Sequence, residues 1–210
     1  MRANRQASKG PYQLITVICL SSLLLFLGSC VRIELKPYNE QFFGQLSGVE
    51  DKNPHANFVL GKIELGRGEY KRAAQYFEQA IAQQPGFAEA HLGLGHCYRE
   101  MHKHNKAIEA YQNALQLNPK SAEANEGLGS IYLALKRYDL AEKYLLQAIA
   151  LEPSNASAHK LLGDIYYINK QYRAALASWE KALQADPHPP EALRALYNDL
   201  KNYAIKYQQP

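Results

Sequence analysis

Residues 88–121 read AEAHLGLGHCYREMHKHNKAIEAYQNALQLNPKS, and the next stretch, residues 122–155, reads AEANEGLGSIYLALKRYDLAEKYLLQAIALEPSN. Small, aromatic and proline residues recur at the same places in both. Two further copies, one before and one after, keep this spacing without an insertion. The four copies span residues 54–87, 88–121, 122–155 and 156–187. A period that stays fixed over four copies predicts a stacked array of structural repeats.

Each copy predicts two helices joined by a short polar turn, which in the second copy is expected at His102–Asn105. The apolar or small residues of that copy lie three or four apart, as on one face of a helix: Leu94, Gly95 and Tyr98, then Ala107, Tyr111 and Ala114. A proline ends each copy because it cannot continue a helix. Ser121, and then Ser154 or Asn155, can cap the helix that follows.

The recurring small residues predict how the helices pack. Gly95 and Ala107 allow two helix axes to approach closely, and aromatic side chains fill the space around them. No single copy can bury its apolar face alone, so neighbouring copies must stack. Two positions depart from the pattern. Glu64 replaces a tyrosine in the first copy, which predicts a solvated face at the end of the array, and His104 replaces a tyrosine in the second.

These residues resemble the tetratricopeptide repeat (TPR) family over about two-thirds of the chain. The resemblance implies an all-α fold, a right-handed α-solenoid of four TPR helix pairs, with a concave groove that binds peptides or helices. Residues 188–210 follow the last copy. They contain an apolar stripe at helical spacing from Glu191 to Tyr207, which predicts a C-terminal capping helix.

By the same resemblance, the first helices line the groove. The implied binding residues are Phe58, Lys62, Leu65, Leu92, His96, Arg99, Glu126, Ser130, Leu133, Lys160, Asp164 and Tyr167. This mixture of apolar and charged groups suits an amphipathic helix or an extended peptide. Stacking is expected to bring Phe58, Leu92, Leu133 and Tyr167 into one row.

This face has two alternative interpretations. Some TPR domains clamp a C-terminal carboxylate with paired cations, but Glu126 and Ser130 stand where those cations are needed, so that mode is not expected. The second alternative is that the face is only solvated and binds nothing.

The segment 1–29 is predicted to be a lipoprotein signal peptide. A basic start precedes an uncharged run from Leu14 to Leu27, which is short for a membrane-spanning helix. The tetrapeptide Leu27-Gly28-Ser29-Cys30 then resembles a bacterial lipobox, so Cys30 is the expected lipidation site. The alternative is an uncleaved signal anchor. Residues 30–53 are expected to be a tether, in which Tyr38–Leu46 forms a short helix covering the first repeat.

Charge argues against nucleic-acid binding. The formal net charge is +4, but Arg2, Arg5 and Lys9 lie in the leader, and the remainder is nearly balanced. Val31 follows the lipidated cysteine and is not the aspartate that retains lipoproteins in the inner membrane. The expected place is therefore the outer membrane of a bacterial envelope, facing the periplasm.

No enzyme signature, cofactor site or metal site is expected. Gly93-Leu94-Gly95 lies inside a helix rather than after a strand, His91 and His96 are five residues apart and face differently, and Cys97 is expected to be a small buried residue. The chain is therefore predicted to be a lipid-anchored scaffold for an envelope protein. Small TPR lipoproteins of this design resemble pilotins of type IV pilus and secretin assembly, and also adaptors of peptidoglycan hydrolases. An enzyme with an unrecognised groove site is the alternative of another class.

Overall fold

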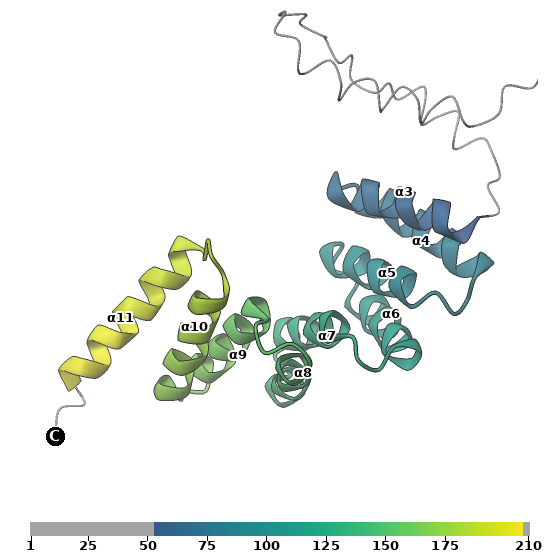
Figure 1. Ribbon diagram of the computed structural model, residues 1–210. Helices are drawn as coiled ribbons and strands as arrows, with labels where there is room; N and C mark the ends of the chain where they lie inside the picture. Colours follow the sequence, from purple (N-terminus) through teal and green to yellow (C-terminus); the bar gives the residue numbers. More distant parts are fainter. Residues whose placement is uncertain (1–52, 208–210) are drawn as a thin grey trace, which may run out of the picture. The chain divides into compact units, whose positions relative to one another are not determined.

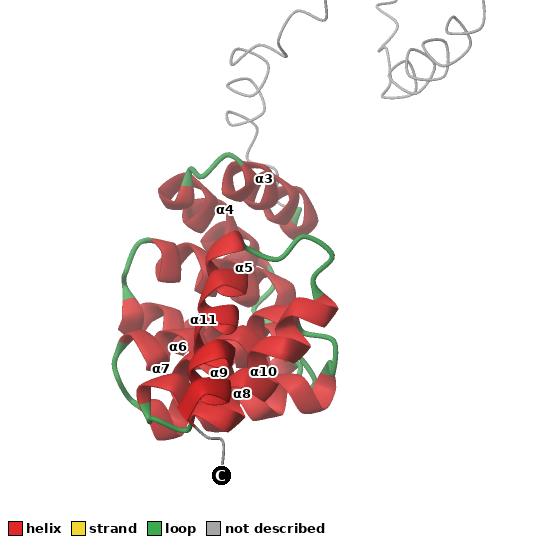
Figure 2. Cartoon of the chain, turned by 90° about the vertical axis from the view of Figure 1, so that its left-hand side faces the viewer, coloured by secondary structure: helices red, strands yellow, loops and turns green. Residues whose placement is uncertain are grey.

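The computed structural model describes residues 53–207, with side chains over residues 53–203. The chain separates into two units, Met1–Glu50 and Asp51–Pro210, and every described helix belongs to the second. No strand occurs among the described residues (Figure 2). The helices are α3 (Pro54–Gly66), α4 (Tyr70–Gln83), α5 (Ala88–Glu100), α6 (His104–Leu117), α7 (Ala122–Ala134), α8 (Tyr138–Leu151), α9 (Ala156–Ile168), α10 (Tyr172–Ala185) and α11 (Glu191–Tyr207). The predicted signal peptide, Cys30 and the short helix predicted at Tyr38–Leu46 lie outside the described residues.

The period of the sequence is also the period of the structure. The first helices of the four pairs, here called A helices, are α3, α5, α7 and α9, and each begins one sequence period after the one before it. Each is followed by a B helix, which packs against its own A helix and against the next one. Consecutive A helices also touch each other. Figure 1 shows the pairs following one another along a curve, with α5 and α7 on its inner side and α6 and α8 on its outer side. The predicted all-α solenoid with a C-terminal helix is confirmed.

Side-chain caps start three of the A helices. The Asn53 side chain accepts a hydrogen bond from the His55 backbone N–H at 3.0 Å, ahead of Pro54 in the first turn. The Ser121 hydroxyl accepts one from Ala124 N–H at 3.1 Å. Of the two capping candidates in the third break, Asn155 is the cap, because its side chain accepts a hydrogen bond from Ala158 N–H at 2.8 Å.

The turn between the two helices of a pair has one backbone requirement. The residue at the fifteenth position of the repeat, which lies in this turn, has a positive φ in every copy: 77° at Gly68, 55° at His102, 58° at Lys136 and 60° at Lys170. This left-handed conformation lets the chain reverse within three residues. The turn predicted at His102–Asn105 was therefore placed too late, because α6 already begins at His104.

Aromatic rings from the B helices fill the joints between the first three repeats. Phe77 lies where a Cβ on Gly61 or Gly93 would fall, at 2.7 and 2.6 Å from its ring. Tyr111 occupies the same place one repeat later, between Gly95 of its own repeat and Gly127 of the next. Both rings are fully buried. The glycines therefore act as predicted for Gly95, letting a ring lie directly against two helix backbones.

The joint between the third and fourth repeats is filled differently. Leu145 replaces the aromatic residue, and a Cβ on Gly129 would lie 2.6 Å from its Cγ. Leu161 replaces the glycine of the following A helix and packs against the core cluster that contains Leu145. A smaller B-helix residue is thus matched by a larger A-helix residue. In the last repeat Trp179 lies against Gly163, and α11 covers the joint with Leu193 and Leu200.

The expectation of a solvated Glu64 was wrong. Its side chain is buried, and one carboxylate oxygen accepts a hydrogen bond from the Arg67 guanidinium at 2.7 Å. The other oxygen has no hydrogen-bond partner among the described residues. At the same repeat position Tyr132 is also buried, and Tyr98 and Tyr166 are partly buried. This eleventh position points toward the packed joint in each copy, so its occupant is shielded from solvent whatever its chemistry.

Candidate protein-binding face

The residues predicted to line the groove all lie on A helices, and none is fully buried. They lie on the part of the A-helix layer that stays at least partly exposed, which we call the A-helix face. The predicted single row of apolar side chains does not occur. Phe58 and Leu92 stand at the fifth position of their repeats, whereas Leu133 and Tyr167 stand at the twelfth. The fifth and twelfth positions are seven residues apart, so they lie about 10 Å from each other along the helix axis.

The apolar members of the set differ in how free they are. Phe58 packs its ring against Phe77 and Phe87, with centroids 5.8 and 4.8 Å apart. Leu92 and Leu133 pack against the main core cluster. Tyr167 packs its ring against Trp179 and Tyr172, with centroids 5.5 and 5.8 Å apart, but remains 41% exposed, and its neighbour Ile168 is exposed as well. The free apolar surface of the A-helix face therefore concentrates in the last repeat.

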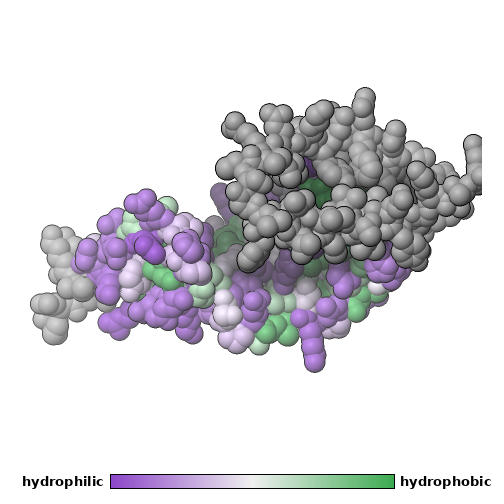
Figure 3. Space-filling view, turned by 45° about the horizontal axis from the view of Figure 1, so that its top comes forward, coloured by the Kyte–Doolittle hydropathy of each residue, from purple (hydrophilic) through white to green (hydrophobic). Residues whose placement is uncertain are grey.

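Ile168 was missed by the sequence analysis. Its neighbour Tyr167 drew attention as an aromatic residue, but Ile168 stands one position later, at the end of α9. In Figure 3 the visible surface of the described residues is mostly hydrophilic, with hydrophobic residues in small separate groups. An apolar pair is therefore a local feature of the surface rather than part of a broad patch.

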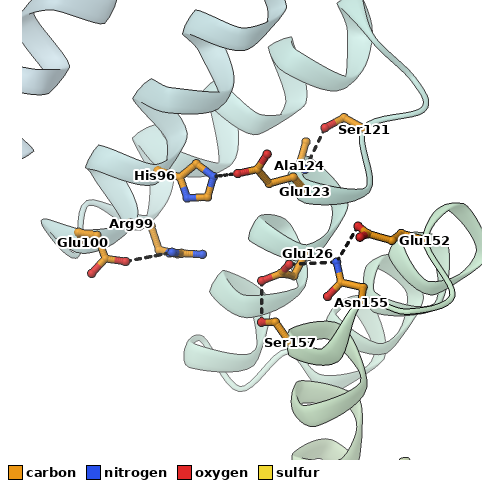
Figure 4. A network of polar contacts seen from close by, with 10 residues as sticks. All are labelled: His96, Arg99, Glu100, Ser121, Glu123, Ala124, Glu126, Glu152, Asn155 and Ser157. Atoms are coloured by element: carbon orange, nitrogen blue, oxygen red, sulfur yellow. Dashed lines mark hydrogen bonds and ion pairs between the residues drawn. The ribbon is translucent and has the colours of Figure 1, made fainter. Parts of the chain in front are cut away.

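Polar side chains on the A-helix face link one repeat to the next. His96 of α5 lies 2.8 Å from a Glu123 carboxylate oxygen of α7 (Figure 4). Glu126 of α7 accepts hydrogen bonds from the Ser157 hydroxyl at 2.7 Å and from the Asn155 amide at 3.2 Å. His96 and Glu126, both predicted as binding residues, therefore join neighbouring repeats. The pKa of Glu123 is lowered, chiefly by the hydrogen bond from His96 and further by nearby positive charge.

Arg99 is the cation best placed for a partner. It donates to the Glu100 carboxylate from Nε at 3.1 Å and from one terminal nitrogen at 3.0 Å. This pair joins adjacent residues near the surface, so it contributes little to stability. Figure 4 shows its guanidinium extending from α5 toward α7, on the same side as His96 and Glu126. A second cation of the predicted set, Lys62 on α3, places its ammonium 5.7 Å from the centroid of a phenylalanine ring on the same helix.

Asp164 connects this face to the core. One carboxylate oxygen accepts a hydrogen bond from the Lys160 ammonium at 2.8 Å, and the other accepts one from the Trp179 indole N–H at 3.0 Å. The buried indole needs such a partner for its N–H. Sequence reasoning placed Asp164 and Lys160 in the groove, but could not show that Asp164 also orients Trp179.

A buried hydroxyl lies beneath the A-helix face. The Tyr111 oxygen has no hydrogen-bond partner among the described residues, and its ring meets the His96 ring edge-on at 5.5 Å. Burial raises the pKa of this phenol well above its ordinary value.

Metal-binding clusters and reactive side chains were the other candidates for a functional site among the described residues. No group of three His, Cys, Asp or Glu residues is close enough to hold a metal ion between residues 53 and 203. Cys97 is buried, as predicted, and burial raises the pKa of its thiol to about 12. His91 and His159 each lie near a proline carbonyl of the preceding turn, Pro85 at 3.1 Å and Pro153 at 3.0 Å. In the stretch that the structure describes, no helix combines the length and hydrophobicity needed to cross a bilayer.

Comparison with known proteins agrees with this architecture. Models of the tetratricopeptide repeat match residues 58–100, 88–121 and 137–190, which together make up more than half of the chain. The chain belongs to the tetratricopeptide repeat family. TPR proteins are protein-interaction scaffolds, and TPR domains bind protein or peptide partners. No curated protein matches the chain by sequence.

Solved structures resemble the TPR array closely. PilF of Pseudomonas aeruginosa is 26% identical, with a TM-score of 0.66 over 73% of this chain and 70% of that one. MamA is 23% identical, with a TM-score of 0.63 over 69% of this chain and 85% of that one. MamA of Desulfovibrio magneticus is 22% identical, with a TM-score of 0.61 over 75% and 92%. The two MamA likenesses show the fold alone.

Proposed function

We propose that this protein is a non-enzymatic adaptor that binds a polypeptide segment on its A-helix face, while lipid on Cys30 anchors it to the outer membrane of a bacterial envelope. The observation that carries the proposal is the pair Tyr167 and Ile168, exposed on the same layer as Arg99. Aromatic residues and Arg are the side chains that most often dominate protein–protein binding.

A polypeptide is the ligand class that fits this face best. Its charged groups are spread over three repeats, with Arg99, Glu126 and Lys160 each on a different A helix. A small molecule cannot contact groups that are separated by whole helices, whereas an extended peptide or a helix can. The contacts between repeats also hold the face rigid, which reduces the entropy lost on binding.

The proposed process is type IV pilus or secretin assembly. PilF, a TPR protein of type IV pilus assembly, supports this at 26% identity over most of both chains. The lipobox-like sequence before Cys30 supports an envelope location. Similarity of fold does not fix a partner, so the pathway must be tested directly.

Capture of partners from envelope membranes tests the proposal. The lipidated full-length protein is used as bait, and bound proteins are identified by mass spectrometry. Arg99→Ala and Tyr167→Ala are each expected to weaken capture by about 1–2 kcal/mol, roughly 5- to 30-fold. The matched control variants Glu180→Ala and Lys181→Ala change exposed residues of α10 and should capture normally. Recovery of peptidoglycan hydrolases instead of secretin or pilus proteins would replace the proposed pathway, and loss of capture only in the α10 variants would exclude the A-helix face.

Anchoring is tested separately through Cys30. Cys30→Ala should block lipid attachment and signal removal, because lipoprotein processing requires the cysteine. The variant should leave the outer-membrane fraction on density-gradient separation. Normal processing and normal fractionation of this variant would contradict the lipid anchor without affecting the proposal for the A-helix face.

A further inference from the structure

The charges of the repeat array are divided between its two edges. The turns from A to B helices, with the first residues of the B helices, carry nine Lys or Arg and two acidic residues, a net charge of +7: residues 67–72, 101–106, 135–140 and 169–174. The loops that follow the B helices carry one Lys and five acidic residues, a net charge of −4: residues 84–89, 118–123, 152–157 and 186–191. We call the first set the basic edge and the second the acidic edge. The nearly balanced total charge hides this separation.

The turns of the basic edge lie side by side. Each B helix runs back along its A helix, so every A helix ends, and every B helix begins, on the same side of the array. A contact between repeats agrees with this, because the Tyr166 hydroxyl near the end of α9 donates to a Glu142 carboxylate oxygen near the start of α8 at 2.8 Å. An open cleft here is lined by these two residues and by residues 170–174 of the next turn. The charges of neighbouring turns therefore belong to one surface.

The cations of the basic edge all reach solvent: Arg67, Lys71, Arg72, Lys103, Lys106, Lys136, Arg137, Lys170 and Arg173. Arg67 pairs with Glu64 and so contributes least to the positive potential. Lys106 lies 5.5 Å from the centroid of the Tyr98 ring, a contact that leaves its charge uncompensated. Cations that share one exposed edge attract an anionic partner together.

We propose that the basic edge lies against an anionic lipid surface and orients the tethered array, with the acidic edge facing away. The proposal rests on the membrane anchor proposed above, which would bring the array next to such a surface. Each Lys or Arg close to anionic lipid strengthens the attraction about fivefold. The cations are spread over four repeats rather than gathered around one pocket, so they match a continuous layer of headgroups better than a single small anion.

Apolar side chains within the basic edge fit the same partner. Leu135 is 38% exposed and directly precedes two of the cations. Tyr138 and Tyr172, the first residues of α8 and α10, are partly exposed. Tyrosine, with an apolar ring and a polar hydroxyl, is suited to the boundary between lipid and water. A soluble acidic partner has no need of apolar groups at this place.

An oriented array leaves the A-helix face accessible. The A helices run from the acidic edge to the basic edge, so their exposed face lies between the two. A lipid anchor fixes only where the chain is attached, whereas a second attachment through a basic surface strengthens the binding and also fixes its direction. The A-helix face would then point along the membrane, toward a partner held in the same envelope.

Two matched reporters on the full-length chain, attached to vesicles, test the orientation. Gln171→Cys lies on the basic edge and Gln84→Cys on the acidic edge, and each replaces an exposed glutamine. Both carry a fluorophore that a nitroxide on the lipid headgroup quenches. On vesicles with about 30% phosphatidylglycerol, quenching should be about threefold or more stronger at Gln171→Cys. Gln84 is nearer to the anchor in sequence, so tethering alone favours the opposite order. The chain without a reporter gives the labelling background, since Cys97 is buried.

Charge variants identify the surface that causes the difference. Removing Lys71, Lys136 and Lys170 together, each by substitution with Gln, should abolish the difference in quenching on the anionic vesicles. The matched control removes three exposed lysines outside the basic edge and should keep the difference: Lys120→Gln, Lys181→Gln and Lys201→Gln. Vesicles of phosphatidylcholine alone, or about 0.5 M sodium chloride, should abolish it for the wild type as well. Circular dichroism confirms that each variant is folded.

The other outcomes overturn the proposal. Equal quenching of the two reporters on anionic vesicles, or equal effects of the two triple variants, means that the basic edge does not face lipid. A difference that soluble polyglutamate or a DNA oligonucleotide abolishes, at the same total charge as the vesicles, assigns the edge to a soluble polyanion. The comparison requires only that the chain be attached, whether through lipid on Cys30 or through residues 1–29. Mass spectrometry of the same sample reads lipid on Cys30 separately, so failure of the anchor is distinguished from failure of the basic edge.

Discussion

The joint between the second and third repeats and the joint between the third and fourth solve one packing problem in two ways. The first places the rigid ring of Tyr111 between Gly95 and Gly127, and the second places Leu145 against Gly129, with Leu161 packed against the same core cluster. In the second of these joints a smaller B-helix residue, Leu145, is accompanied by a larger A-helix residue, Leu161, in place of a glycine. The repeat period therefore determines which positions of neighbouring helices face each other. The residue types at those positions determine whether the side chains pack without overlap or a void.

The largest expected loss of stability comes from disrupting the joint between the second and third repeats. Gly127→Leu places a side chain on the Tyr111 ring, which is buried and cannot rotate away. We expect a loss of about 3 kcal/mol or more in the free energy of unfolding, measured by urea denaturation. The double variant Gly127→Leu with Tyr111→Leu copies the second joint and should recover most of that loss. If the two single losses simply add, the joints are not interchangeable in the way proposed.

The matching change in the joint between the third and fourth repeats should destabilise the protein less. Gly129→Leu meets the Cγ of Leu145, a branched chain that can adopt another rotamer, while the nearest backbone atom is 3.4 Å away. We expect a loss of about 2 kcal/mol, smaller than that of Gly127→Leu. Thermal unfolding of both variants in one buffer gives the order directly. Equal losses would mean that ring rigidity does not distinguish the two joints.

A gain in stability is expected from removing the Tyr111 hydroxyl, which lies in the joint between the second and third repeats. Tyr111→Phe removes the buried hydroxyl that lacks a hydrogen-bond partner among the described residues. Because an unpaired buried polar group is destabilising, we expect the free energy of unfolding to rise by about 1 kcal/mol. A drop in stability would show that the hydroxyl is satisfied in solution. The second joint has no polar counterpart at this position, since Leu145 is already apolar.

The smallest expected effect concerns the contact between His96 and Glu123, which links the second and third repeats. The pKa of Glu123 is lowered in the folded protein from an ordinary value of 4.5, chiefly by its hydrogen bond with His96. The carboxylate therefore contributes stability that is present above pH 4.5 and is lost as the pH falls through the lowered pKa. The Glu123 side chain is 59% exposed, so solvent screening limits the loss to about 0.5 kcal/mol. Chemical denaturation at pH 6 and at successively lower pH should show a smaller drop for His96→Ala than for the wild type.

Much of the fold could be predicted because the repeat makes every copy evidence for the others. The close approach at Gly95, the burial of Cys97 and the C-terminal helix from Glu191 to Tyr207 follow from spacing alone. The match of Leu145 with Leu161 could not be predicted, because the two residues are 16 apart and share no pattern until the helices are stacked. Glu64 was misjudged because residue type was allowed to outweigh repeat position.

The A-helix face could be only partly predicted from the sequence. Repeat position placed every predicted residue on an A helix, but the apolar residues were grouped by type and so were assigned to one row. The links of Glu126 with Ser157 and of Asp164 with Trp179 depend on side-chain directions in neighbouring helices. Ile168 could have been found by asking which residue follows Tyr167 at the end of its helix.

The matched joints have a consequence for how such a gene can change. A recombination event that deletes the third repeat in register would bring Leu161 against Tyr111, and one that duplicates it would bring Gly127 against Leu145. The first product is overfilled and the second leaves a void, although both keep the reading frame and the period. The order of the repeats is therefore part of the packing, and a change that shifts whole repeats requires compensating substitutions at the new joints.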